Sequence, residues 1–114
     1  MGSDRISPEE ANARVLAGEP IVFVDARNSK AWESSDRKIP GALRVPAGDV
    51  ESHLEEIDSG STVIAYCTCP SEQSSLEVAK SLMEKGYSRV FALRGGFDAW
   101  VAAGYPIEMK TMAA

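Results

Sequence analysis

Two cysteines in one polar segment form the most reactive pattern in the sequence. Cys67 and Cys69 follow an apolar run that ends at Tyr66 and precede a helical pattern that starts near Ser75. Unpaired backbone N–H groups and the dipole at a helix N-terminus stabilise a thiolate over a thiol, so a cysteine there is a nucleophile. The same donors hold an anion carried by the sulfur, such as a persulfide. The segment therefore predicts nucleophilic chemistry rather than a cysteine that only packs in the core.

The numbers of cysteines and histidines exclude other uses of sulfur. A single C-x-C pair is too small for a disulfide framework and lacks the second half of a zinc site. The chain has one histidine, His53, which excludes a histidine-rich metal centre. We therefore expect no metal and no cofactor.

The composition is that of one globular domain. Of 114 residues, 44% are hydrophobic and 25% are charged, and a chain of this length folds without staples. The net charge of −5 comes without a block of Lys or Arg, which argues against nucleic acid or an anionic membrane as a partner. No apolar run approaches the ~18 residues of a membrane helix, and the first residues lack the apolar segment of a signal peptide. Together with cysteines suited to a reducing compartment, this favours the cytoplasm.

Alternating apolar and helical patterns predict the elements that position the cysteines. Continuous apolar runs are typical of strands buried on both faces, and capping residues, glycines and helical spacing mark the helices between them. The expected strands cover residues 21–24, 42–45, 62–66 and 89–93. The first expected helix runs from Pro8, capped by Ser7, to near Gly18, and a short one lies around 31–33. The next begins at Asp49 as cap and ends at Ile57, and the last runs from Phe97 to Gly104. Between these two, a helix with Ser74 as cap extends to Gly86 and points Leu76, Ala79 and Met83 inward.

This alternation predicts a single α/β domain over residues 1–114. Short connections imply parallel strands joined by right-handed crossovers, hence a small doubly wound sheet of about five strands with helices on both faces. We expect a loose start at 1–4 and a loose tail at 107–114. Ligands in such folds bind beyond the carboxyl ends of the strands, and the segment from Tyr66 to Ser75 lies at one of these ends.

Five motifs in order along the chain carry a family resemblance. They are Val24-Asp25-Ala26-Arg27, the turn Ile39-Pro40-Gly41-Ala42, the loop flanks Tyr66-Cys67 and Ser74-Ser75, the pair Gly86-Tyr87, and the end Gly95-Gly96-Phe97 with Trp100. Over nearly its full length the chain resembles the rhodanese-like sulfurtransferase domains. Each motif alone is weak, but five in this order are specific.

The resemblance implies a reaction as well as a fold. In this family a cysteine thiolate attacks the sulfane sulfur of a donor such as thiosulfate and releases sulfite. The cysteine persulfide sits among the amides of the active-site loop and passes its sulfur to a thiol or to cyanide. This is covalent catalysis with electrostatic stabilisation by the loop. The implied partners are a small sulfur-containing donor and a thiol acceptor, either a small molecule or a protein.

The cysteine loop departs from the family pattern, which leaves two candidate nucleophiles. Cys69 has the family's spacing to the helix that starts near Ser75, whereas Cys67 directly follows the strand. The loop is two residues longer than usual and resembles a C-x-C-P-x-E variant. We favour Cys69, because spacing to the helix decides how the amides meet the sulfur. The other loop residues are Thr68, Pro70, Ser71, Glu72, Gln73, Ser74 and Ser75.

Two loop residues affect the choice of donor. Pro70 removes one N–H group from the loop, and Glu72 repels an anionic donor unless it points to solvent. A persulfide or polysulfide carrier therefore suits the loop better than thiosulfate. Cys67 has three interpretations: it packs against the end of the sheet, which we favour, it acts as a resolving thiol for Cys69, or it forms a strained disulfide with it.

Charged and aromatic residues elsewhere are expected to support the site. Arg27 is predicted to form a structural ion pair with Glu33, and Asp25 to accept hydrogen bonds from loop amides. Arg94, at the end of the last strand, is the candidate contact for an anionic donor. Lys38 stands where the family more often has His, so no role transfers to it. The aromatic side chains expected in the core are Trp32, Phe97 and Trp100.

Three other functions are weighed against sulfur transfer. A phosphatase class of the same fold uses a C-x5-R loop whose arginine binds phosphate, but Gln73 stands six residues after Cys67 and Ser75 six residues after Cys69. Phosphatase or arsenate reductase activity is therefore not expected. A rhodanese-like module that has lost catalysis serves as a binding or regulatory domain, and Pro70 with Glu72 keeps this alternative open. A two-cysteine thiol redox protein is the third.

Overall fold

Two of the apolar runs in the sequence form the centre of a parallel sheet. In a computed structural model, which describes residues 4–68 and 73–110, β2 (Ile21–Asp25) pairs with β5 (Thr62–Tyr66) from Ile21↔Thr62 to Asp25↔Tyr66. The five strands run in the order β1-β6-β5-β2-β4, with β6 at Val90–Leu93, β1 at Asp4–Ile6 and β4 at Leu43–Arg44. Every residue of β5 is buried, as in a strand covered on both faces.

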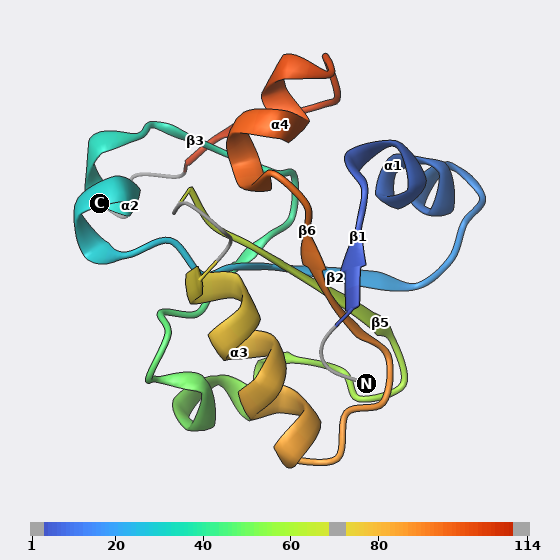
Figure 1. Cartoon of the computed structure of the whole chain (residues 1–114), viewed down its shortest axis with the longest axis vertical. Coiled ribbons are helices and arrows are strands. Elements are labelled where there is room, and N and C mark those ends of the chain that lie inside the picture. The colour runs from blue at the N-terminus through green and yellow to red at the C-terminus, as the bar shows by residue number, and fades with distance from the viewer. Residues whose placement is uncertain (1–3, 69–72, 111–114) are drawn as a thin grey trace.

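Helices cover both faces of this sheet (Figure 1). On one face α3 (Gln73–Glu84) and the 3-10 helix η1 (Val50–Glu56) enclose a core of small aliphatic side chains. On the other face α1 (Pro8–Leu16) and α4 (Gly96–Ala102) enclose a core that is richer in aromatic residues. The predicted α/β domain with a five-stranded parallel sheet between helices is confirmed.

The start of α1 follows from its first residues. The Ser7 hydroxyl accepts a hydrogen bond from the backbone N–H of Glu10, with Oγ and N 3.1 Å apart, and Pro8 occupies the first turn. A serine cap satisfies one of the otherwise unpaired N–H groups, and proline has no N–H to leave unpaired there.

Two predicted helices differ from the structure in detail. The segment after Asp49 is a 3-10 helix, and the Asp49 carboxylate accepts a bond from the Ser52 hydroxyl (2.7 Å) in place of capping the backbone. Helix α3 begins at Gln73, so Ser74 lies inside its first turn and is not its cap. Its buried residues, Ser75, Val78, Ala79 and Leu82, follow spacings of three and four, which leaves Met83 exposed rather than inward.

Two further elements lie beyond the main sheet. Helix α2 (Ser29–Ser34) follows β2, and a two-stranded antiparallel sheet pairs β3 (Arg37–Lys38) with β7 (Glu108–Met109). Strand β7 corrects the prediction of a loose tail from residue 107, as β1 corrects that of a loose start at residue 4, because in both places a strand partner satisfies the backbone. The remaining parts of those predictions, 1–3 and 111–114, lie outside the described residues.

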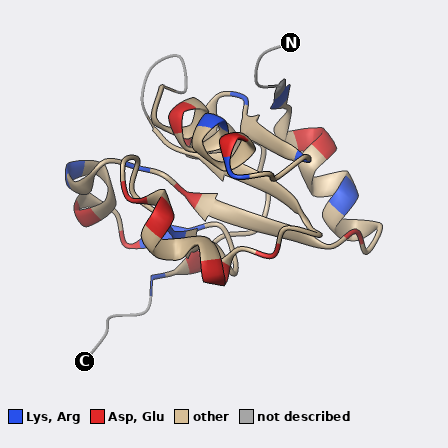
Figure 2. Cartoon of the chain, turned by 90° about the horizontal axis from the view of Figure 1, so that it is seen from below, with Lys and Arg blue, Asp and Glu red and all other residues tan. Residues whose placement is uncertain are grey.

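The surface has mixed charge. In the view of Figure 2, Lys and Arg are interspersed with Asp and Glu along the helices and loops. Within residues 4–68 and 73–110, no helix is both long enough and apolar enough to cross a bilayer.

Candidate functional site

The carboxyl ends of three neighbouring strands bring polar side chains to one edge of the sheet. Asp25 of β2 is in register with Tyr66 of β5 on one side and with Arg44 of β4 on the other. Cys67 directly follows Tyr66, and Thr68 is the last described residue before the loop that leads to α3. The structure therefore joins the start of the cysteine loop to Asp25 and Arg44 at the edge where ligands bind in such folds.

Cys67 is enclosed between the first turn of α3 and the turn before α4. Its side chain has no exposed surface, and its thiol donates to the hydroxyl of the buried Ser75, with Sγ and Oγ 3.6 Å apart. Its carbonyl oxygen accepts a hydrogen bond of 2.9 Å from the N–H of Phe97. Both its side chain and its backbone are thus fixed by helices from opposite faces of the sheet.

Gly96 explains why the chain can approach Cys67 so closely. Its φ of 66° is in the left-handed region, which glycine adopts without strain. A Cβ at this position would lie 2.0 Å from the Cys67 carbonyl oxygen. The second glycine of the Gly95-Gly96 turn is therefore required by direct contact with the backbone at the start of the loop.

A buried ion pair lies beside the end of β5. Asp25 and Arg27 have exposed side-chain fractions of 0% and 1%, and their closest atoms, Oδ2 and Nη2, are 2.6 Å apart. The Asp25 carboxylate also accepts bonds from the Arg27 backbone N–H (3.1 Å) and from the Tyr66 hydroxyl (2.7 Å). The Tyr66 hydroxyl accepts from the N–H of Ile39 (3.2 Å), and Arg27 donates to the carbonyl of Arg37 (2.8 Å). These bonds connect the two central strands to the segment 37–39.

Aromatic rings complete the surroundings of Arg27. Its Cζ lies 4.6 Å from the centre of the Phe97 ring and 5.3 Å from that of Trp32. Phe97 in turn stacks on Tyr66 with centroids 5.6 Å apart. Such cation–π contacts stabilise a charge that has lost its water.

Tyr66 is held in its neutral form by this environment. Burial raises the pKa of its hydroxyl well above the ordinary value, and the charge of Asp25 raises it further. A hydroxyl that stays protonated remains a donor to Asp25, so Tyr66 acts as a bridge in the network and not as a base.

Arg44 forms a second, more open cationic cluster with Trp32 and Lys110. The Arg44 Cζ lies 4.9 Å from the centre of the Trp32 ring, and the Lys110 Nζ lies 4.1 Å from it. Arg44 also donates to the carbonyl of Asp25 (3.1 Å). Burial lowers the pKa of the Arg44 guanidinium; the charge of Asp25 opposes this shift and that of Arg27 adds to it.

The predicted site residues fall into four groups. Asp25, Arg27, Cys67 and Ser75 are buried together at the carboxyl edge. Arg27 pairs with Asp25 rather than with the predicted Glu33, because Asp25 is two residues away on the same strand end and equally buried. Arg94 lies exposed after β6, where its backbone N–H donates to Ile6 (2.8 Å). At the loop ends, Thr68 and Ser74 are half-buried and Gln73 is exposed. The residues that lie outside the described part of the chain are Cys69, Pro70, Ser71 and Glu72.

Two functional candidates were missed by reasoning from the sequence alone. Arg44 had the signal of a charged residue at the end of a short strand before Pro46, but no motif marked it. Lys110 had no local signal, because only the pairing of β7 with β3 brings it to Trp32.

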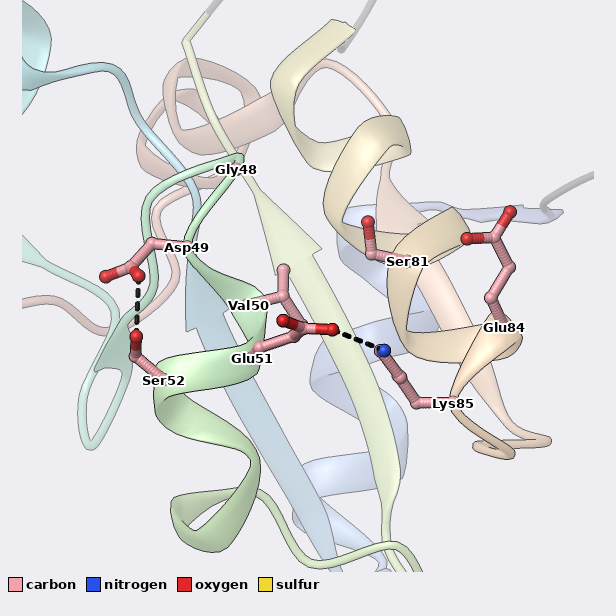
Figure 3. A pocket seen from close by; sticks show the side chains of 8 residues that line it. All are labelled: Gly48, Asp49, Val50, Glu51, Ser52, Ser81, Glu84 and Lys85. Atoms are coloured by element: carbon pink, nitrogen blue, oxygen red, sulfur yellow. Dashed lines mark hydrogen bonds and ion pairs between the residues drawn. The ribbon is translucent and has the colours of Figure 1, made fainter.

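A hollow in the described surface lies elsewhere. It has a volume of about 320 Å³ and lies between η1 and α3 (Figure 3). An ion pair from Lys85 Nζ to Glu51 Oε2 (2.5 Å) spans it. Its lining residues are Gly48, Asp49, Val50, Glu51, Ser52, Ser81, Glu84 and Lys85. Three carboxylates and one ammonium make it a poor site for an anionic substrate.

Comparison with known proteins connects this geometry to a family. A sulfurtransferase from Allochromatium vinosum is 34% identical over 104 residues, which are 91% of this chain and 94% of that protein. The thiosulfate sulfurtransferase GlpE of Glaesserella parasuis is 32% identical over 91% of this chain and 92% of its own length. A solution NMR structure of a rhodanese-like domain from Anabaena sp. superposes with a TM-score of 0.77 at 24% identity, covering 93% of this chain and 79% of that one.

The rhodanese-like domain family itself matches residues 7–103. The match spans the elements from α1 to α4 and includes the carboxyl edge with its cysteine loop. This chain belongs to the rhodanese-like domain family.

Proposed function

We propose that this chain is a sulfurtransferase that carries a sulfane sulfur as a persulfide on Cys69. The observation that carries the proposal is the enclosure of Cys67: its side chain is fully buried, and Ser75 and Phe97 bind its thiol and carbonyl. A buried cysteine of this kind packs and positions, and is closed to a donor. This leaves the second cysteine of the loop as the one to meet substrate.

The surroundings of the loop suit an anionic intermediate. The loop ends at Gln73, the first residue of the twelve-residue helix α3, whose N-terminal N–H groups and dipole favour negative charge. Relatives at 34% and 32% identity are a sulfurtransferase and a thiosulfate sulfurtransferase.

The proposed reaction has two steps. The Cys69 thiolate attacks the outer sulfur of the donor and forms a sulfur–sulfur bond, while the donor's own sulfur–sulfur bond breaks and its electron pair leaves on sulfite or on a thiolate. An acceptor thiolate or cyanide then attacks the outer sulfur of the cysteine persulfide, and the Cys69 thiolate leaves. Neither step needs an external oxidant or reductant. A cytoplasmic setting, where thiols stay reduced, belongs to the same proposal.

Intact-mass measurement after exposure to donors tests this function. The reduced protein is incubated with thiosulfate, and separately with a polysulfide, beside the variants Cys67→Ser and Cys69→Ser. We expect the wild type and Cys67→Ser to gain one sulfur atom and Cys69→Ser to gain none. If only Cys67→Ser fails to gain the sulfur atom, the function stands and Cys67 is the nucleophile. A folded wild type that gains no sulfur from either donor would overturn the proposal in favour of a binding module, and a mass loss of two hydrogens would favour a redox protein.

A further inference from the structure

The cluster of Trp32, Arg44 and Lys110 carries a positive charge that the described protein does not neutralise. Three cations contact the Trp32 ring, since Arg27 also lies 5.3 Å from its centre. The one carboxylate among them, Asp25, is already bound to Arg27 at 2.6 Å. Three positive charges against one negative charge leave the cluster with an excess of two.

The other carboxylates of this region are paired elsewhere or stand apart. Glu108 pairs with Lys38 (3.4 Å), and Asp36 pairs with Arg37 (3.7 Å). Glu33, next to Trp32, is exposed. Within residues 4–68 and 73–110, no ion pair joins a carboxylate to Arg44 or Lys110.

An arrangement of this kind has an electrostatic cost. Arg44 is half-buried and close to the charge of Arg27, so both lost hydration and like-charge repulsion disfavour its guanidinium. Its bond to the Asp25 carbonyl occupies one of its N–H donors, and a guanidinium has five. Charged groups shifted by burial and by a neighbouring charge gather at functional sites, and a guanidinium with donors to spare binds anions through them.

The position of Arg44 relates the cluster to the cysteine loop. Its Nη1 lies 3.1 Å from the carbonyl oxygen of Asp25, so the guanidinium folds back over the carboxyl end of β2. Strand β5, which leads into the loop, is the next strand of the sheet, about 4.8 Å away. An anion held by Arg44 is therefore beside the segment where the loop begins.

We propose that Arg44, stacked on Trp32 and flanked by Lys110, binds the anionic group of the incoming sulfur donor. This inference rests on the proposed sulfurtransferase function and names a specificity residue for it. The anionic group is the sulfonate of thiosulfate or the carboxylate of a persulfide made from an acidic thiol. The cluster takes the place of the exposed Arg94 as the main contact for donor charge.

Donors with and without a carboxylate or sulfonate beside the reacting sulfur test the inference. Persulfide loading is measured against the concentration of thiosulfate, of N-acetylcysteine persulfide and of the persulfide of its methyl ester. In Arg44→Gln the half-saturating concentration of the anionic donors rises about tenfold with little change in maximal rate, as expected for a lost charge-assisted bond. The methyl ester is unaffected. An effect on thiosulfate alone identifies the sulfonate, and one on N-acetylcysteine persulfide alone identifies the carboxylate.

A matched control separates this effect from the loss of one positive charge. Arg89→Gln makes the same replacement just before β6, at the opposite edge of the sheet, where Arg89 donates to the carbonyl of Gly60 (2.6 Å). The inference would be overturned if Arg44→Gln and Arg89→Gln had equal saturation curves. It would also be overturned if Arg44→Gln raised the half-saturating concentration of the methyl ester as much as that of the anionic donors. If Arg44→Gln does not fold, Lys110→Gln takes its place, with an expected rise of about threefold for a half-exposed charge.

Binding without chemistry keeps this inference distinct from the proposed function. Calorimetry with thiosulfate uses Cys69→Ser, with and without Arg44→Gln, so no sulfur is transferred. Weaker binding in the double variant supports the anion site even if the wild type never forms a persulfide. Equal binding in the two proteins contradicts it even if the wild type does.

Discussion

Two ion pairs in this molecule have nearly the same length and opposite settings. Arg27 and Asp25 approach to 2.6 Å with side chains 1% and 0% exposed, whereas Lys85 and Glu51 approach to 2.5 Å with side chains 39% and 76% exposed. The first pair shares its carboxylate with Tyr66 and its guanidinium with three aromatic rings. The second spans an open hollow (Figure 3). Distance alone therefore does not indicate which of the two ion pairs contributes more to stability.

Burial decides where this fold depends on polar contacts. Removing one partner of a buried pair leaves a charge without water or counter-ion, whereas an exposed charge is rehydrated at once. Through Tyr66 the buried pair is also coupled to the strand that ends at Cys67. We therefore expect substitutions at the carboxyl edge to change both the stability of the protein and the geometry of the site. Substitutions in the hollow between η1 and α3 should change neither of these.

Breaking the buried pair gives the largest expected effect. Arg27→Met keeps an apolar stem but leaves the Asp25 carboxylate buried without a counter-ion, so we expect the free energy of unfolding to fall by about 3–5 kcal/mol. Urea denaturation measures it, and Arg27→Lys, which retains the charge, should lose less. A loss below about 1 kcal/mol in Arg27→Met would remove the contrast with the exposed pair.

The close approach of Gly96 to Cys67 gives the next largest effect. In Gly96→Ala the left-handed φ costs about 1–2 kcal/mol, and the contact with the Cys67 carbonyl adds about 1–3 kcal/mol of overpacking. Gly104→Ala is the matched control, since Gly104 has a φ of 81° and nothing within 4 Å of an added Cβ. Equal losses in the two variants would show that the backbone contact at Cys67 does not constrain the edge.

Tyr66→Phe removes a single hydroxyl from the buried network around Asp25. Asp25 loses a donor and the buried N–H of Ile39 loses its acceptor, so we expect a loss of about 1–3 kcal/mol at neutral pH. Thermal and urea unfolding measure this loss. An unchanged stability would mean that the Arg27–Asp25 pair is sufficient without its third member.

The same variant predicts a dependence on pH. The folded-state pKa of Tyr66 is raised, so its contribution is fully present below the ordinary tyrosine value of about 10. Above it the unfolded chain releases the proton first, and wild-type stability falls by up to about 1.4 kcal/mol per pH unit. Tyr66→Phe should lack this component, so the stability difference between the two proteins shrinks as the pH rises from 9 to about 11. A constant difference would contradict the buried, neutral hydroxyl.

Local sequence signals were sufficient for most of the fold. Apolar runs marked β2, β5 and β6, and Ser7 with Pro8 marked the start of α1, because each signal lies within a few residues of the element that it specifies. The ends of the chain were harder to predict. Strands β1 and β7 are two or three residues long and exist through partners far away in the sequence.

The site was predictable only where its contacts are local. A structural ion pair at Arg27 could be anticipated from its position after a buried strand. The partner of Arg27 could not, because Asp25 and Glu33 are both near it in sequence and only burial separates them. Arg44 and Lys110 meet at Trp32 through pairing across two sheets, which no short motif encodes.

Removing the exposed pair of Lys85 and Glu51 gives the smallest expected effect. The hydrogen bond from Lys85 lowers the pKa of Glu51, so any contribution is present above the ordinary carboxyl pKa and is lost as the pH falls through the lowered value. Both side chains are exposed, and salt screens their attraction. We expect Glu51→Gln to unfold at the same urea concentration as Glu55→Gln, an exposed neighbour on the same 3-10 helix, at high and low salt. A clear loss confined to Glu51→Gln, removed by salt, would show that the hollow between η1 and α3 is held by its ion pair, and burial would no longer be what distinguishes the two pairs.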